Sequence, residues 1–369
     1  MWRWTFKSLL AEPLAILVSI AAAGSAFLLV IFFEAVYEGE SEQIVAYVKH
    51  AEADVWVMQR GVANMHMATS YLNDWKLAQV RAVPGVADVE GILYLNTVIE
   101  SGAQQWFAYI VGLDVPSTQA GPWAMAAGRD QPGPGEAVVP AVFADMAELK
   151  LGDPVRITDR DFTIVGFSEG TFSMANSVIF VTKSDLEDIM TSLDIVSYGL
   201  VKAEPGTDPV ELAARIEGAV EKVDALPADQ FVINDQRMAM QMGVETIALM
   251  TLIGGALAVL LVAFTIYSQV SRQRRELAVA KALGATNRFL YISAGLQATA
   301  ITIASVVVAT LLAVAVMPLA TALIPPVTLK LTVAAVARIA LVGFIVALVA
   351  SLIPARQIAR VDPLSAFQA

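Results

Sequence analysis

The chain has 369 residues, of which 57% are hydrophobic and only 16% charged, and it contains no cysteine. A chain this apolar lies outside the usual range of soluble globular proteins, and without cysteine it forms neither disulfides nor thiolate metal sites. The formal net charge of −11 is unevenly distributed. Residues 37–243 carry 13 basic and 30 acidic side chains, whereas the segments 1–13, 268–288 and 355–369 together carry nine basic and three acidic ones.

Four apolar stretches are each long enough to cross a bilayer, because about 20 helical residues at ~1.5 Å per residue cover the ~30 Å of hydrocarbon. The residues between the first and the second stretch have the composition of a water-soluble domain. We therefore predict an α-helical membrane protein with a one-plus-three arrangement of spans and a large α/β domain outside the cytoplasm. The predicted transmembrane helices are 14–36, 244–268, 289–317 and 331–353.

Basic residues in short loops mark the cytoplasmic side of a membrane protein. Both chain termini, namely 1–13 and the tail 354–369, and the loop 269–288 are therefore predicted to be cytoplasmic, with 37–243 and the short loop 318–330 outside. A cleavable signal peptide is the alternative for the N-terminus, but it would have a shorter apolar core followed by a small-residue cleavage site. The first stretch instead continues into helical sequence, which favours an uncleaved anchor.

Several segments next to the spans are predicted to be helical. Residues 1–13 combine tryptophans with Arg3 and Lys7, which is typical of an amphipathic helix at the membrane interface. Residues 35–49 and 236–245 are predicted to form helical stalks. Small residues at 21–26 and 254–256 indicate either close helix packing or simple alanine richness.

The outer domain is predicted to have two lobes. An α/β lobe is expected at about 50–125 and 190–235, with a β-rich insertion at about 126–189, where Gly–Pro turns separate short strands. Asp208 and Pro209 are typical of a helix N-terminus. In chain order the α/β lobe should contain strand 54–59, helix 70–82, strand 86–95, strand 197–203, helix 208–222 and strand 230–234, and the insertion should contain strands 155–158, 162–167 and 178–181.

Catalytic and metal-binding patterns are scarce. The sequence has no G-x-x-x-x-G-K-[ST] motif and no H-E-x-x-H motif, so it predicts neither nucleotide hydrolysis by a P-loop nor a zinc protease. Met58, Met65, His66 and Met67 could bind copper(I), but without thiolates or further histidines a loop or lobe-packing role around His66 is favoured. Ion-driven carriers need ionisable groups deep in their spans, whereas Glu34 and Arg338 lie near span ends.

The segment 272–288, RQRRELAVAKALGATNR, is the most informative short stretch. Its basic residues could serve only to set the topology. Leu277, Ala280, Lys281 and Gly284 nevertheless recur at helical spacing, and a glycine at this point is typical of a helix end. We predict a short helix at the cytoplasmic face that receives force from a partner protein. Its candidate contact residues are Arg272, Arg275, Glu276, Leu277, Ala280, Lys281, Leu283 and Gly284.

The segment 275–285 resembles the R-E-I-G-x-x-K-A-L-G-A motif of MacB/FtsX-type permeases of ATP-binding-cassette (ABC) systems, the type VII superfamily. The tail 354–366 resembles the closing P-A-x-x-A-x-x-x-P-x-x-A-L motif of that family. Ala278 replaces a usual glycine, and Gln297 stands where many members have an acidic residue. Residues 53–95 also resemble DevC-like exporter permeases.

The resemblance implies the transmembrane permease subunit of an ATP-driven exporter or extractor, which is not itself an enzyme. A separate cytoplasmic ABC ATPase would bind ATP and Mg, dock on 272–284 and move the outer domain by mechanotransmission. The resemblance further implies a homodimer in a bacterial inner membrane, surrounded by lipid, acting on periplasmic or outer-leaflet substrates. A periplasmic adaptor and an outer-membrane channel are further implied partners; nucleic acid, a metal and a cofactor bound by this chain are not.

Two other functions remain open at this stage. An FtsX-like regulator would activate a periplasmic partner such as a cell-wall hydrolase without transport, and a sensor would work with a signalling kinase. The size of the predicted outer domain, 37–243, favours the exporter.

Overall fold

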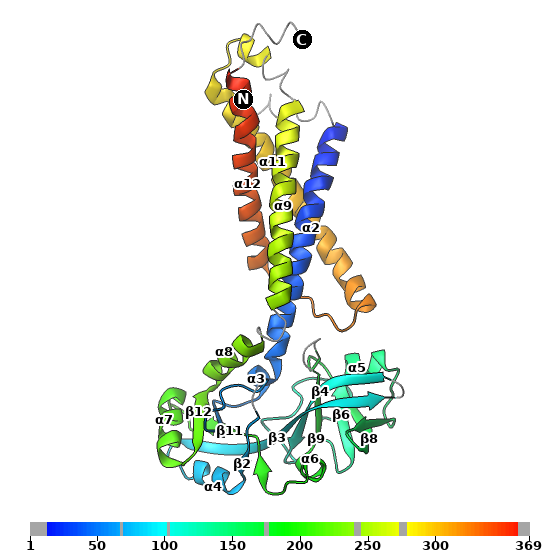
Figure 1. The fold of residues 1–369 in the computed structure, drawn as a ribbon, viewed down its shortest axis with the longest axis vertical. Coiled ribbons are helices and arrows are strands. Elements are labelled where there is room, and N and C mark those ends of the chain that lie inside the picture. Colours follow the sequence, from blue (N-terminus) through cyan, green and yellow to red (C-terminus); the bar gives the residue numbers. More distant parts are fainter. Residues whose placement is uncertain are drawn as a thin grey trace. The chain divides into compact units, whose positions relative to one another are not determined.

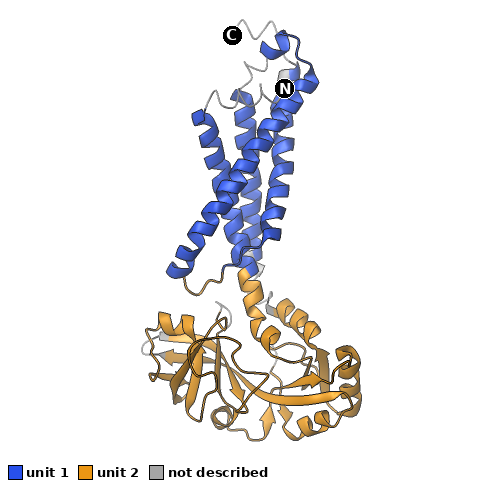
Figure 2. Ribbon diagram, turned by 180° about the vertical axis from the view of Figure 1, so that it is seen from behind, with its two compact units in different colours: residues 1–38, 246–323, 329–369 blue, residues 39–245, 324–328 orange. Residues whose placement is uncertain are grey.

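A computed structural model describes residues 13–66, 69–101, 104–172, 177–239, 245–272 and 279–360. The chain divides into two compact units, which are coloured separately in Figure 2. We call them the helical unit and the sheet unit. The helical unit comprises residues 1–38, 246–323 and 329–369, and the sheet unit comprises residues 39–245 and 324–328. Apart from its last residue, the predicted interfacial helix 1–13 lies outside the described residues.

Four long helices dominate the helical unit, and each is long and apolar enough to cross a membrane, as predicted. They are α2 (Pro13–Ile44), α9 (Glu245–Arg272), α11 (Asn287–Leu323) and α12 (Val333–Arg360), and they are labelled in Figure 1. Two of them extend further than the sequence suggested. Helix α11 continues through Pro318, so the connection to α12 starts at residue 324 rather than 318, and α12 continues through Pro354 into the predicted tail.

Small residues bring these helices close together. A Cβ atom added at Gly343 of α12 would lie 2.5 Å from the ring of Phe27 in α2, and one at Gly254 of α9 would lie 3.0 Å from the ring of Phe33. Ala23 and Ala26 of α2 are buried in the same core. Close packing rather than chance therefore explains the small residues in α2.

The sheet unit is built around one mixed sheet of ten strands in the order β12-β1-β11-β3-β4-β9-β6-β8-β5, with β7 paired to β3 and β8. The strands are β1 (Val55–Gln59), β3 (Val86–Ser101), β4 (Gln104–Leu113), β5 (Met125–Gly128), β6 (Glu136–Pro140), β7 (Pro154–Ile157), β8 (Arg160–Ser168), β9 (Val178–Thr182), β11 (Tyr198–Ala203) and β12 (Val223–Pro227). A two-stranded sheet joins β2 (Leu72–Asn73) to β10 (Ile195–Val196). The helices are α3 (Ala46–His50), α4 (Trp75–Arg81), α5 (Ala141–Met146), α6 (Lys183–Met190), α7 (Pro209–Ala219) and α8 (Ala228–Ala239).

Alternation along β1 shows how both faces of the sheet are covered. Val55 and Val57 belong to the core shared with α4 and α7, whereas Trp56 and Met58 belong to the core shared with α3 and α8. Successive strand residues point to opposite faces, so four consecutive buried residues require helices on both sides. In Figure 1, α3 and α8 lie above β11 and β12, and α4 lies below them.

The strands expected in a separate insertion belong to the same sheet as the rest of the unit. Strand β9 pairs in parallel with β4, and β7 pairs with the far end of β3. The 16-residue β3 makes this possible, because its first half pairs with β11 and its second half reaches β7. The two predicted lobes are thus joined by hydrogen-bonded strands.

Two local predictions were wrong. Residues 230–234, predicted as a strand, lie in α8, and the strand is β12 just before it. Phe231 and Asp235, four residues apart, are both fully buried, so helical spacing decides the structure of this short apolar run. The helix predicted at 70–82 begins only at Trp75, because Leu72 and Asn73 pair with β10.

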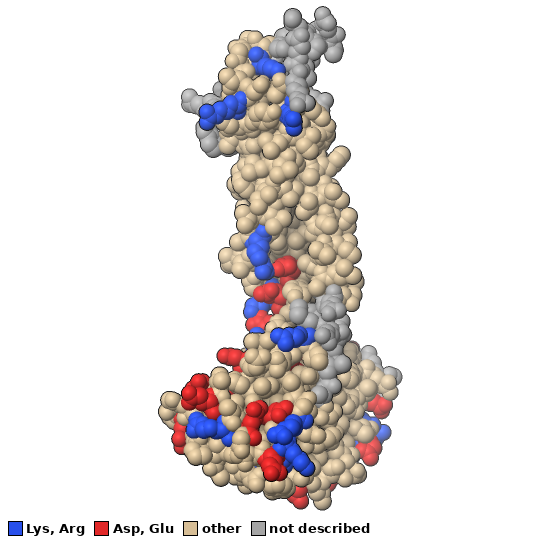
Figure 3. Space-filling view, turned by 60° about the vertical axis from the view of Figure 1, so that its left-hand side comes forward, with Lys and Arg blue, Asp and Glu red and all other residues tan. Residues whose placement is uncertain are grey.

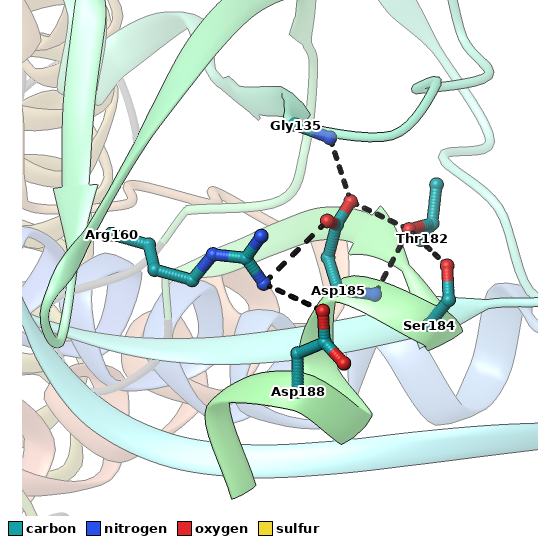
Figure 4. A network of polar contacts seen from close by, with 6 residues as sticks. All are labelled: Gly135, Arg160, Thr182, Ser184, Asp185 and Asp188. Atoms are coloured by element: carbon teal, nitrogen blue, oxygen red, sulfur yellow. Dashed lines mark hydrogen bonds and ion pairs between the residues drawn. The ribbon is translucent and has the colours of Figure 1, made fainter. Parts of the chain in front are cut away.

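Other details of the sheet unit agree with the sequence. The side chain of Asp208 accepts a hydrogen bond from the amide of Val210, and Pro209 occupies the first turn of α7, as predicted. Figure 4 shows a comparable cap at α6, where the amide of Asp185 donates to Thr182. The Asp185 carboxylate accepts from the amide of Gly135 at 2.8 Å, which fixes the loop before β6 against α6.

Candidate functional site

The predicted partner-binding segment begins where α9 ends, at Arg272. Its central residues, Arg275, Glu276 and Leu277, lie outside the described residues. The structure describes the segment again from residue 279, and residues 279–282 form one helical turn. We call residues 279–284 the coupling turn.

The coupling turn ends at Gly284, as predicted. Gly284 has φ +97°, a left-handed conformation that favours glycine. The amide of Gly284 donates to the carbonyl of Lys281, and the amide of Ala285 donates to the carbonyl of Ala280, both at 3.0 Å. This pair of bonds is the Schellman motif, which satisfies the last carbonyls of a helix and turns the chain sharply.

One side-chain contact holds the coupling turn against a long helix. The Lys281 ammonium donates to the carbonyl of Ala359 at 2.6 Å, which ties the turn to the last residues of α12. Two residues, 285 and 286, connect the turn to α11, and the hydroxyl of Thr286 accepts from the amide of Phe289 at 3.3 Å, capping that helix. The turn is therefore attached to α12 by a hydrogen bond and to α11 by a short, capped connection.

Large apolar side chains of the coupling turn are exposed. Leu283 is 85% exposed and Val279 36%, whereas Ala280 is partly buried. A large aliphatic side chain presented on a turn that is joined to two helices is a suitable contact for another protein, because its burial there removes apolar surface from water. The sequence placed Leu283 within the segment but did not single it out.

Basic side chains accompany the coupling turn. Lys281 lies in the turn, and Arg272 and Arg288 lie at the helix ends next to it in the sequence. Arg356 lies near the end of α12, the helix that Lys281 contacts. Figure 3 shows the long middle part of the helices almost free of charged side chains on the face in view, with Lys and Arg at the upper end of the view.

The contacts of polar groups inside the helical unit were not predicted from the sequence. The hydroxyl of Ser19 in α2 donates to the side-chain carbonyl of Gln269 in α9 at 3.1 Å, and both residues are buried. Gln297 in α11 is fully buried, and within the described part of the chain neither end of its amide has a hydrogen-bond partner. Near the opposite helix ends, Arg338 of α12 pairs with Glu34 of α2 at 2.7 Å.

Ionic contacts in the sheet unit are structural. The Lys183 ammonium lies 2.5 Å from Asp74 and within 4.0 Å of Asp114 and Glu187. Burial pulls the pKa of Lys183 down, but the three carboxylates outweigh burial and leave the pKa raised. Because Asp74 precedes α4 and Lys183 begins α6, this cluster links two helices that both pack on β3.

A second buried cluster surrounds Asp235 of α8. Its Oδ1 accepts from the amides of Met65 and His66 and lies 2.8 Å from Nδ1 of the His66 ring. His66 thus has the packing role that the sequence favoured. Among the described residues no group of three or more His, Cys, Asp or Glu side chains is placed to hold a metal ion. Met67 lies outside the described residues.

Tyrosines pack around this cluster. Burial, with the Asp235 charge as a second cause, raises the pKa of Tyr109 to about 12 and raises that of Tyr198 further. Burial likewise raises the pKa of Tyr94 well above its ordinary value. The tyrosines are therefore neutral hydrogen-bonding groups at physiological pH rather than acids or bases.

Comparison with known proteins identifies the chain. The model of the MacB-like periplasmic core domain matches residues 14–219, more than half of the chain, and that of the FtsX-like permease C-terminal domain matches residues 248–363. The chain belongs to the MacB/FtsX family of ABC transporter permeases. The second match covers the coupling turn of this permease and most of the tail motif.

Relatives over nearly the full length carry the same description. An uncharacterised ABC transporter permease of Mycobacterium tuberculosis is 24% identical to this permease over 317 residues, 85% of this chain and 84% of the relative. One from Mycobacterium bovis is 22% identical over 355 residues, 95% of each chain.

Two solved structures are similar to part of the permease. The periplasmic region of MacB from Actinobacillus actinomycetemcomitans has a TM-score of 0.37 and 11% identity, covering 50% of this chain and 94% of that one. The extracellular domain of the noncanonic ABC-type transporter YknZ from Gram-positive bacteria has a TM-score of 0.36 and 13% identity, covering 47% of this chain and 98% of that one.

Family membership makes the permease a membrane subunit that is not itself catalytic, and an ABC transporter permease implies an ATPase partner. The four candidate spans and the periplasmic-type domain indicate an inner-membrane protein.

Proposed function

We propose that this permease is the transmembrane subunit of an ATP-driven exporter or extractor that receives force at the coupling turn. The observation that carries the proposal is Leu283, an 85% exposed apolar side chain on a turn that Lys281 ties to α12 and that a two-residue connection joins to α11. An ATPase that packs on Leu283 therefore pushes on two long helices at once.

Force leaves the helical unit as movement of whole helices. The helices meet through glycine and alanine contacts such as Gly343 against Phe27, which resist compression. Helix α2 contributes residues to both units, because it runs from Pro13 to Ile44. In this scheme nucleotide-driven closure of two ATPase subunits displaces the helices, and the sheet unit changes its hold on a substrate.

The orientation and the assembly follow from the same scheme. The basic helix ends and the coupling turn face the cytoplasm, and the acidic sheet unit faces the periplasm. Two copies of the permease stand above two ATPase subunits that bind ATP and Mg. The substrates come from the periplasm or the outer leaflet. A periplasmic adaptor and an outer-membrane channel extend the export route of these substrates.

Replacing Leu283 tests the docking site. Leu283→Ser, in permease co-expressed with its partner ATPase, should lower the amount of ATPase that co-purifies about tenfold, because burying an exposed leucine against a partner contributes about 1.5–3 kcal/mol and every 1.4 kcal/mol is tenfold in affinity. Leu323→Ser is the matched control, since Leu323 is 72% exposed at the opposite end of α11. Equal recovery of the ATPase with both variants would contradict the proposal.

A second test concerns the residues before the turn. Replacing Glu276 and Leu277 with reversed-charge or bulky residues should uncouple the ATPase while the permease still inserts. The permease purified alone should hydrolyse no ATP, since it has no P-loop. If Leu283→Ser reduces ATPase binding but substrate release in cells is unchanged, the coupling site stands and export is wrong.

A further inference from the structure

An open groove of about 250 Å³ lies in the helical unit between α2, α9 and α12. Its lining is mostly aliphatic and aromatic. Phe27, Val262 and Val346 are the lining residues of their helices that lie farthest along the chain from the Glu34, Gly255 and Arg338 end. From Arg338 to Val346 along α12 the groove spans eight residues, or about 12 Å at ~1.5 Å per residue.

A glycine helps to keep the groove open. A Cβ atom built at Gly255 of α9 has no atom within 4 Å, although Gly255 lines the groove. The neighbouring Gly254 is different, because its added Cβ would lie 3.0 Å from the Phe33 ring. Gly254 therefore serves close helix packing, whereas Gly255 leaves unfilled space.

A charged pair lies at one end of this apolar groove. Arg338 and Glu34 both line it, and one guanidinium nitrogen of Arg338 donates to a carboxylate oxygen of Glu34 at 2.7 Å. The Arg338 side chain is 64% exposed and that of Glu34 only 18%. A guanidinium carries five N–H donors in a fork that suits phosphate, so Arg338 can bind a further anion.

An apolar groove within a bilayer is filled by hydrocarbon. Water would find few polar partners along its walls, and a void would lose the dispersion contacts of every lining side chain. A groove with aliphatic walls and an arginine at one end therefore complements a molecule with one apolar tail and an anionic head. Lipids of the surrounding membrane have this chemistry.

We propose that the groove binds one acyl chain of a phospholipid, with the lipid phosphate held by Arg338. The site is distinct from the coupling turn, and binding requires no ATPase, so the inference does not depend on the proposed transport function. Gly255 sets the space for the chain, and Glu34 orients the guanidinium.

The other occupant to be tested is a helix from a second copy of the chain. Such a helix would fill the apolar part of the groove. It would leave the remaining donors of Arg338 without an anion, which is why the charge at the groove end favours the lipid.

Native mass spectrometry of the full permease can separate the two occupants. Delipidated protein is titrated with phosphatidylglycerol, and the first bound lipid is quantified. Gly255→Leu should weaken that binding about tenfold by filling the groove. Ala256→Leu is the matched control, because it adds the same bulk to the next residue, which is exposed and does not line the groove.

Two further ligand measurements test the headgroup contact. Arg338→Gln, combined with Glu34→Gln so that no lone carboxylate remains, should weaken phosphatidylglycerol about tenfold while barely changing the binding of uncharged diacylglycerol. Wild-type protein should in turn prefer phosphatidylglycerol to diacylglycerol.

Three results would overturn the proposal. Equal lipid binding by Gly255→Leu and Ala256→Leu would remove the groove as the site. Loss of dimers in Gly255→Leu with lipid binding retained would assign the groove to a second copy. Equal binding of diacylglycerol and phosphatidylglycerol by wild-type protein would remove the role of Arg338. If Gly255→Leu fails to fold, the Arg338→Gln and Glu34→Gln double variant decides on its own.

Discussion

The two units of this permease fill their interiors with different kinds of side chain. The largest fully buried residues of the sheet unit include Trp56, Tyr109 and Tyr198. Among the described residues, ten of the 18 buried core residues of the helical unit are alanines, packed with a smaller set that includes Phe27 and Ile31, while large residues such as Leu260, 66% exposed, face outward. The sheet unit is held together by removing large apolar side chains from water, and the helical unit by close approach of backbones in lipid.

The largest effect should come from truncating the core of the sheet unit. Trp56 has no exposed surface and stacks on Phe231 at a ring-centroid distance of 4.8 Å. Trp56→Ala should lower the free energy of unfolding by about 3–5 kcal/mol, because it leaves a cavity. Chemical denaturation followed by tryptophan fluorescence and circular dichroism measures the loss. Leu260→Ala should change stability by less than about 0.5 kcal/mol; equal losses would erase the contrast between the units.

The next comparison concerns buried polar groups. Asp235→Ala should cost the sheet unit about 3 kcal/mol, because the amides of Met65 and His66 would lose their buried acceptor. Gln297→Met in the helical unit should be neutral or stabilising, since its amide has no hydrogen-bond partner among the described residues. Thermal unfolding of both variants measures these effects. A destabilised Gln297→Met variant would reveal a partner for this amide in the assembled complex.

How much of the fold and of the candidate site could be predicted from the sequence depends on the distance along the chain between the groups involved. The four apolar helices, the Asp208 cap and the end of the coupling turn at Gly284 follow from local patterns, and the structure agrees. Residues 230–234 were mispredicted because a short apolar run fits a strand or a helix equally well by periodicity. The Gly284 turn was predictable because glycine's conformational freedom is a property of one residue.

Contacts between distant segments were not predictable. Lys281 and the carbonyl of Ala359 are 78 residues apart, and Arg338 and Glu34 are 304 apart. From the sequence, Arg338 was placed only near the end of its span. Such pairs depend on which helix faces meet, and that is decided by the shapes of many small side chains rather than by a motif.

The third prediction reverses the first, because in the helical unit adding bulk should do more harm than removing it. Gly343→Leu should destabilise the helices by about 1–3 kcal/mol, since even its Cβ would lie 2.5 Å from the Phe27 ring. Helicity loss on denaturation in mild detergent measures the change. Gly255→Ala is the control, because its Cβ meets open space. A Gly343→Leu variant as stable as Gly255→Ala would show that Phe27 moves aside freely.

The last prediction concerns the stability of the sheet unit in alkali. This effect is absent at neutral pH and is confined to the sheet unit. Burial first and the Asp235 charge second raise the pKa of Tyr109 to about 12 from its ordinary 10. Above pH 10 the unfolded chain loses this proton while the folded chain keeps it, so the free energy of unfolding should fall as the pH rises from 10 to 12 and stay unaffected below 9. Tyr109→Phe should flatten that fall, and Tyr71→Phe, at an exposed position, should not. Ultraviolet absorbance of phenolate reports the ionisation. An unchanged fall in the Tyr109→Phe variant, with phenolate forming in the folded protein only near pH 12, would show that Tyr109 does not cause the loss of stability. The loss would then come from Tyr94 and Tyr198, whose pKa values burial also raises. The Asp235 cluster would still distinguish the sheet unit from the helical unit.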